Sequence, residues 1–154
     1  MNKPSETDRI EKRLTLRTAR SRVWRALCDS TEFGAWFGVQ LTGPFHPGAT
    51  VRGSVTHPGY EHVTLELQVV AMEPERYFSY RWRPNAIDPH EDYSSEPTTL
   101  VEFTLEETAD GTLLTLVESG FDGIPLRRRA EAFRGNDSGW TAQCKRIEQY
   151  VSAA

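Results

Sequence analysis

The sequence predicts an α+β protein in which a curved antiparallel sheet of six or seven strands wraps around one long C-terminal helix. Between Val39 and Glu118, short apolar runs alternate with turn sequences, which is typical of antiparallel strands. From Leu126 to Val151, apolar residues recur at spacings of three and four, which indicates an amphipathic helix. One face of such a sheet has to be covered, and only this helix is long enough to cover it, so we expect the sheet to curl around it.

The first part of the chain is predicted to form one strand and two short helices. Residues 9–18 alternate between polar and apolar, with the inward set Ile10, Lys12, Leu14 and Leu16 interrupted only by the lysine. After Thr18, a candidate N-cap, the helical spacing of Val23, Trp24, Leu27 and Cys28 predicts a helix that ends at Asp29-Ser30. Ser30 is then expected to cap a second helix over residues 31–37, which contains Phe33, Trp36 and Phe37.

The middle of the chain is predicted to be an antiparallel meander. Five runs are expected to be strands, and a weaker one is possible at residues 39–41; the five are Thr50–Thr56, Glu61–Met72, Tyr77–Arg83, Thr98–Glu106 and Thr112–Glu118. The third places Phe78, Tyr80 and Trp82 on one face. The last is ambiguous, because two alternating pairs compete for the core, Leu113 with Val117 and Leu114 with Leu116.

The C-terminal helix is predicted to have one buried stripe and one solvated side. The stripe comprises Ala130, Phe133, Asp137, Trp140, Cys144, Ile147 and Val151. The solvated side comprises Arg127, Arg128, Glu131, Arg134, Thr141, Lys145 and Glu148. Gly135 and Gly139 could divide the helix, but one helix with a weak middle is the favoured interpretation.

Length, charge and cysteine content are those of an ordinary intracellular domain. With 154 residues and a net charge of −4, we expect one domain over residues 9–152 after a disordered or extended segment at residues 1–8. This charge does not favour a nucleic-acid partner. The chain has no apolar run suited to a signal peptide or to membrane insertion, so a cytoplasmic protein is expected, with Cys28 and Cys144 as reduced packing residues.

Several segments together resemble a known family. They are Val23-Trp24-Arg25-Ala26-Leu27 with Trp36, residues 73–82 (EPERYFSYRW), residues 98–103 (TTLVEF), residues 111–116 (GTLLTL), Glu118-Ser119-Gly120-Phe121 and Gly139-Trp140. In this order they resemble the START-related SRPBCC superfamily, and in particular the branch named after the activator of the heat-shock-chaperone ATPase. The resemblance implies a helix-grip fold that encloses a cavity for apolar small molecules. One departure is that Ala19-Arg20 stands where the family commonly has Ser-Pro, which affects the helix cap.

The candidate binding residues are those expected to line a tapered space between sheet and helix. They are Trp36, Phe37, Tyr80, Trp82, Phe103, Glu118, Phe121, Phe133 and Trp140. Each aromatic residue could equally be core packing. Glu118 could be a general base or a polar anchor, but a solvated acid beside the Gly120 turn is favoured, because no second acid, histidine or nucleophile is fixed near it by spacing.

The sequence contains no motif for a catalytic residue, a cofactor or a metal. The four histidines, His46, His57, His62 and His90, lack the short fixed spacings of zinc sites and are interpreted as turn residues. The leading hypothesis is therefore non-catalytic binding of a small apolar or aromatic molecule by a monomer or homodimer. The alternatives are a protein-interaction module of the co-chaperone type and a cavity enzyme, cyclase-like or hydrolase-like, that uses Glu118 or Tyr80.

Overall fold

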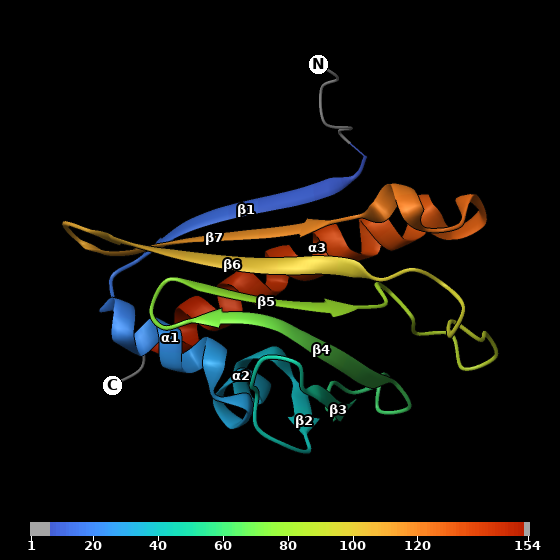
Figure 1. The fold of residues 1–154 in the computed structure, drawn as a ribbon, viewed down its shortest axis with the longest axis horizontal. Helices are drawn as coiled ribbons and strands as arrows, with labels where there is room; N and C mark the ends of the chain where they lie inside the picture. Colours follow the sequence, from blue (N-terminus) through green and yellow to red (C-terminus); the bar gives the residue numbers. More distant parts are fainter. Residues whose placement is uncertain (1–6, 153–154) are drawn as a thin grey trace.

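Seven strands form one antiparallel sheet in the computed structural model, which describes residues 7–152 (Figure 1). The strand order is β1-β7-β6-β5-β4-β3-β2. The strands are β1 Arg9–Leu16, β2 Val39–Leu41, β3 Thr50–Val55, β4 Thr64–Glu73, β5 Tyr77–Trp82, β6 Thr99–Thr108 and β7 Gly111–Ser119. The helices are α1 Arg20–Cys28, α2 Ser30–Phe37, the 3-10 turn η1 Phe121–Gly123, and α3 Leu126–Ser152. Residues 1–8 were expected to be disordered or extended, and residues 1–6 of this segment lie outside the described residues.

The long helix α3 lies along one face of the sheet, and α1 and α2 lie beside its C-terminal half (Figure 1). This arrangement confirms the predicted helix-grip fold. No helix within residues 7–152 is both long and apolar enough to cross a membrane. The weak strand at residues 39–41 is present as β2 and gives the sheet its seventh strand at one edge.

Strand β7 resolves the ambiguity left by its sequence. Its buried residues are Thr112, Leu114, Leu116 and Glu118, while the alternate residues are partly exposed. Leu114 and Leu116 therefore face the core, and the same alternation carries Glu118 inward. A glutamate at the end of this strand is fully buried for that reason.

Two polar residues that interrupt the predicted apolar patterns are partners of each other. Lys12 on β1 donates a hydrogen bond from Nζ to Oδ1 of Asp137 on α3 over 2.8 Å. Each residue lies on a face that is otherwise apolar, and their pairing allows β1 to pack against the helix.

The two short helices are capped differently from the prediction. Ala19 precedes α1 without a side-chain cap, and the Thr18 hydroxyl donates instead to the backbone oxygen of Val151, 3.4 Å away. Ser30 is the first residue of α2 and not its cap. Asp29 caps this helix, because its carboxylate accepts hydrogen bonds from the backbone amides of Thr31 and Glu32.

Helix α3 is continuous through both of its glycines. Trp140, Ile147 and Val151 are buried as predicted, but Ala130 is exposed, and Phe133, Asp137 and Cys144 are only partly buried. The buried positions in the first turns are Arg128 and Ala132. The stripe shifts there because the loop at residues 83–98 covers the side of the helix that was predicted to be solvated.

Cys28 and Cys144 are free and partly buried, which agrees with the predicted reduced state. Burial raises the pKa of both thiols, so less of each is present as the reactive thiolate near neutral pH. We expect both to react slowly with an aqueous thiol reagent in the folded protein and rapidly in denaturant. A thiol reagent that releases a coloured product is used, and the absorbance of that product measures the reaction rate in each state. An intact mass two units below that of the reduced chain would contradict the free-thiol state.

Candidate functional site

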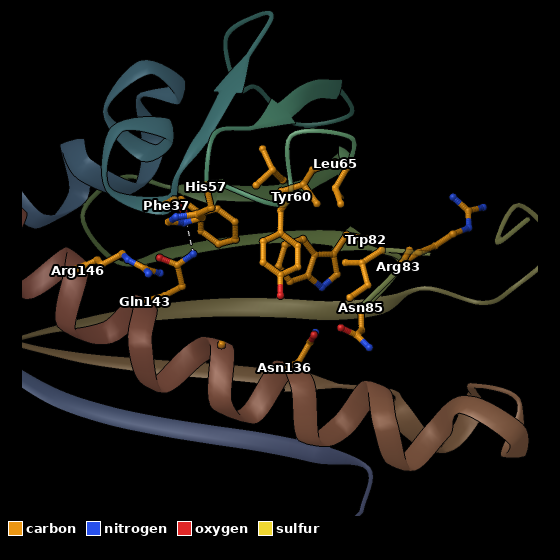
Figure 2. A pocket seen from close by; sticks show the side chains of 15 residues that line it. Phe37, His57, Tyr60, Leu65, Trp82, Arg83, Asn85, Asn136, Gln143 and Arg146 are labelled. Carbon is orange, nitrogen blue, oxygen red and sulfur yellow. Dashed lines mark hydrogen bonds between the residues drawn. The ribbon is translucent and has the colours of Figure 1, made fainter. Parts of the chain in front are cut away.

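A pocket of about 260 Å³ opens where β5 ends, between α3, the β3–β4 hairpin and the loop at residues 83–98 (Figure 2). Its walls are mostly apolar. Phe37, Tyr60 and Trp82 supply aromatic rings, and the aliphatic side chains are those of Val55, Val63, Leu65 and Ile87. Tyr60 and Ile87 are 49% and 38% exposed and stand at the rim on two different loops. Two of the large apolar residues exposed within residues 7–152 therefore border one opening.

Helix α3 contributes the polar wall of the pocket. Asn136, Gly139, Gln143 and Arg146 follow one another at spacings of three and four, so they share one side of the helix. A Cβ at Gly139 would meet no atom within 4 Å, so this position leaves open space against the helix. The pocket thus combines apolar walls from the sheet and loops with a polar strip from α3 and with polar loop residues, namely His57, Arg83 and Asn85.

The end of the pocket near α2 is fixed by hydrogen bonds to one carbonyl. The backbone oxygen of Phe37 accepts from Nε2 of Gln143 at 2.8 Å and also lies 3.2 Å from Nε2 of His57. Gly38, next in the chain, has a left-handed φ of 92°, and a Cβ there would overlap the His57 ring. Glycine is therefore required both by its backbone conformation and by the close approach of the histidine.

Behind the pocket, Glu118 joins the sheet to the helix through a buried carboxylate. Its Oε1 accepts from Nε1 of Trp140 at 2.7 Å and from Nδ2 of Asn136 at 2.9 Å. Its Oε2 accepts from Nε1 of Trp82 at 2.7 Å and from the Thr99 hydroxyl at 2.5 Å, and it also lies 3.1 Å from Asn136 Nδ2. Within residues 7–152 no cationic side chain forms an ion pair with it. Neutral donors from β5, β6 and α3 surround this carboxylate.

The favoured prediction that Glu118 is a solvated acid is wrong. The residue is fully buried because it continues the inward alternation of Leu114 and Leu116. Two of the donors to Glu118 were predictable as neighbours, since Asn136 and Trp140 are four residues apart and therefore share one side of α3. Glu118 fixes Trp82 and Asn136, which are both pocket walls, but it does not line the pocket itself.

Tyr80 lies deeper in the core than Trp82. It is fully buried, and its hydroxyl has no hydrogen-bond partner within the described part of the chain. Burial raises the pKa of Tyr80 well above the usual value for tyrosine, and the negative charge of Glu118 is the second, smaller cause. The side chain therefore stays neutral. Tyr80 does not line the pocket.

Of the nine candidate binding residues, Phe37 and Trp82 line the pocket. Trp36, Phe103 and Trp140 border a void of only about 10 Å³ beside α3. Tyr80 and Phe121 are core residues, and Phe133 packs its ring on Phe121 at 5.2 Å. The aromatic rings of β5, β6, α2 and α3 pack within about 6 Å of one another, so the centre of the expected space between sheet and helix is filled. The open volume lies instead at the end of the sheet.

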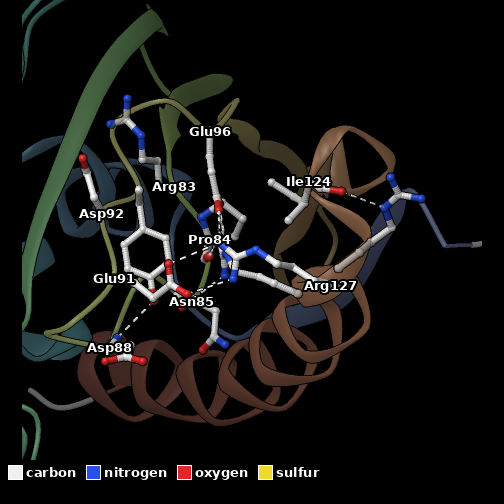
Figure 3. Close-up of polar contacts among 12 residues, drawn as sticks. Arg83, Pro84, Asn85, Asp88, Glu91, Asp92, Glu96, Ile124 and Arg127 are labelled. Carbon is white, nitrogen blue, oxygen red and sulfur yellow. Dashed lines mark hydrogen bonds and ion pairs between the residues drawn. The ribbon is translucent and has the colours of Figure 1, made fainter.

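The loop that closes one side of the pocket is held by Arg128. Figure 3 shows the polar contacts of this region, with Pro84 and Glu96 on the loop. Arg128 donates to both carboxylate oxygens of buried Glu96, with a shortest distance of 2.7 Å, and to the backbone oxygen of Pro84 at 3.0 Å. Its guanidinium also lies 4.7 Å from the centre of the Tyr93 ring. The prediction that Arg128 is solvated is therefore wrong. This residue fastens residues 84–96 to the first turns of α3, and the pocket residues Asn85 and Ile87 belong to that segment.

The histidines are dispersed within residues 7–152, where no three His, Cys, Asp or Glu side chains gather as metal ligands. His57 lines the end of the pocket near α2, beside the Phe37 carbonyl. A ring nitrogen of His62 lies 3.0 Å from the backbone oxygen of Ile87, which links the two loops of the rim.

The family model described as "Activator of Hsp90 ATPase homolog 1-like protein" matches residues 17–152. The fold is similar to protein MLL2253 from Mesorhizobium loti, with 24% sequence identity, a TM-score of 0.75, and coverage of 94% of this chain and 96% of that one. It is also similar to the Aha1 dimer from Colwellia psychrerythraea, with 13% identity, a TM-score of 0.71, and coverage of 94% and 96%.

A further similar structure is DynU16, described as a putative protein in the dynemicin biosynthetic locus. It has 23% identity and a TM-score of 0.72, and the alignment covers 95% of this chain and 48% of that one. No curated protein sequence matches the chain. At such identities the likeness to the solved structures concerns the fold alone.

Proposed function

The chain belongs to the family of Activator of Hsp90 ATPase homolog 1-like proteins, and from this premise we propose that it binds a small, mainly apolar molecule non-covalently in the pocket at the end of β5. The observation that carries the proposal is a concave site with aromatic walls and a few polar groups that converge from α3 and the neighbouring loops. Ligand sites in proteins commonly combine these two features. The volume of about 260 Å³ suits a ligand of one or two fused rings.

The hydrogen bonds behind the pocket support the same function. Trp82 and Asn136 are both bonded to Glu118, and Gln143 is bonded to the carbonyl of Phe37. Three walls are therefore held in place before any ligand arrives. A wall fixed in advance loses little freedom on binding, which favours affinity in a small site.

We expect a flat aromatic ligand to raise the melting temperature and to quench tryptophan fluorescence, with about micromolar affinity because so small a ligand makes few contacts. Trp82→Ala and Tyr60→Ala should each weaken binding about tenfold, because each removes one aromatic wall of the pocket. Titration by calorimetry measures the change in Kd.

Trp24→Ala is the matched control, since Trp24 is a partly buried tryptophan on α1 that does not line the pocket. Tyr60→Ala is the pocket variant that should fold normally, because Tyr60 is half-exposed and its loss should leave the core intact. Weaker binding by this variant therefore cannot be attributed to misfolding. Equal binding by wild type and both pocket variants would contradict the proposal, as would the absence of any melting shift across a panel of flat aromatic compounds.

A second candidate function is a protein-interaction surface, and exposed Tyr60 and Ile87 at the rim favour it. It becomes the better account if small ligands leave the melting temperature unchanged. A cavity enzyme that uses Glu118 or Tyr80 has less support, because neither side chain lines the pocket.

A further inference from the structure

The permanently charged groups that line the pocket are of one sign. Arg83 and Arg146 are among its lining residues, and Asp and Glu are not. In the chain as a whole, 22 acidic residues outnumber 18 lysines and arginines. The lining therefore offers an anion two arginines and no carboxylate, and the nearby Glu118 is already bonded to four neutral side chains.

Arg146 is the group of this set that is available to a ligand. Figure 2 shows its side chain reaching from α3 toward the end of the pocket where Phe37 and His57 lie, whereas Arg83 extends away from them. Arg83 is also engaged, because its Nη2 donates to the backbone oxygen of Ser94 at 3.0 Å.

The guanidinium of Arg146 makes no hydrogen bond or ion pair with any group in residues 7–152. Arg17, Arg81 and Arg134 also lack such a partner there, but they are exposed and water can solvate them. Arg146 is partly buried and lies against an apolar pocket. Its donors are not taken up by any protein acceptor in residues 7–152, so a bound anion can accept from them.

From these observations we infer that the ligand of the proposed pocket is an apolar carboxylate, whose negative group pairs with Arg146 while its ring or chain lies against Phe37 and Trp82. This inference rests on the proposed function. The planar fork of a guanidinium matches a carboxylate with two parallel hydrogen bonds. Gln143 uses one of its two Nε2 hydrogens on the Phe37 carbonyl and carries no charge, so the charged partner of the carboxylate is Arg146. One inward-facing arginine matches one negative charge better than the higher charge of a phosphate monoester.

The test compares 2-naphthoate with 2-naphthamide, which have the same ring system and differ in charge. Calorimetry at low salt gives both Kd values for the wild type, Arg146→Gln and Arg134→Gln. The wild type should bind the carboxylate about tenfold more tightly, as a charge-assisted bidentate pair requires. Arg146→Gln should lose this preference and melt at the wild-type temperature without ligand. Arg134→Gln makes the same charge change on an exposed part of α3 and should keep the preference.

The outcomes separate the two proposals. If the wild type binds the amide as well as the carboxylate, or if Arg146→Gln keeps the preference, the pocket remains a ligand site but the assignment of an acid is wrong. If neither compound binds the wild type, both the acid assignment and the ligand-binding function fall.

Discussion

Replacing Trp140 by alanine is expected to lower the free energy of unfolding by about 3–5 kcal/mol, as other large-to-small changes in protein cores do. The side chain is 3% exposed, and its ring lies within about 6 Å of the rings of Phe37, Trp82 and Phe103. Its Nε1 also donates to Glu118, which joins α3 to the sheet. Truncation therefore opens a cavity and removes one donor from a buried carboxylate. Urea unfolding followed by far-ultraviolet circular dichroism measures the loss.

Trp140→Phe separates these two effects. It keeps most of the apolar contact but cannot donate to Glu118, so the loss should be smaller, about 1–3 kcal/mol, the range for a buried polar group deprived of one partner. A loss below about 1 kcal/mol for the alanine variant would show that the helix does not depend on this contact. Equal losses for the two variants would assign the whole effect to the hydrogen bond.

The sequence predicted the architecture because each element depends on local periodicity. The strands followed from alternation and turn residues, and the unbroken α3 followed from spacings of three and four. Lys12 and Asp137 looked like errors in two patterns, yet each is the partner of the other. Such a pairing joins residues that are distant in the sequence, and periodicity describes only residues that are close in it, so it does not predict the pairing.

The site was predicted less well, because its residues come from loops and from polar positions on α3. Tyr60 and Ile87 lie in segments without periodicity, so no pattern placed them at one opening. Phe37 and Trp82 were found because they are large and apolar, but the same rule also selected Tyr80 and Phe121, which are core residues. Aromatic character identifies burial, and only the packing of the whole chain decides which ring faces open space.

The second large effect is expected at Arg128, where substitution by methionine should lower the free energy of unfolding by about 3–5 kcal/mol. Methionine retains much of the apolar stem, so the main consequence is a buried Glu96 carboxylate that has lost its hydrogen-bonded partner and keeps only exposed Arg127 at 3.9 Å. Arg127→Met is the matched control on the same helix. Arg127 is exposed, pairs with Glu91 at 2.8 Å and lies 3.9 Å from an oxygen of Glu96, and a pair of an exposed side chain contributes at most about 1 kcal/mol.

The double variant Arg128→Met/Glu96→Leu identifies the cause of that loss. Removing both charges leaves no stranded carboxylate, so stability should return to within about 1–2 kcal/mol of the wild type. The bonds from Arg128 to the backbone of Pro84 and Asn85 remain lost in this variant. Hydrogen exchange should therefore still be faster at residues 84–96 than in the wild type, even after stability recovers. If the double variant is as unstable as Arg128→Met, the loss arises from these backbone bonds or from the Tyr93 contact and not from the buried charge.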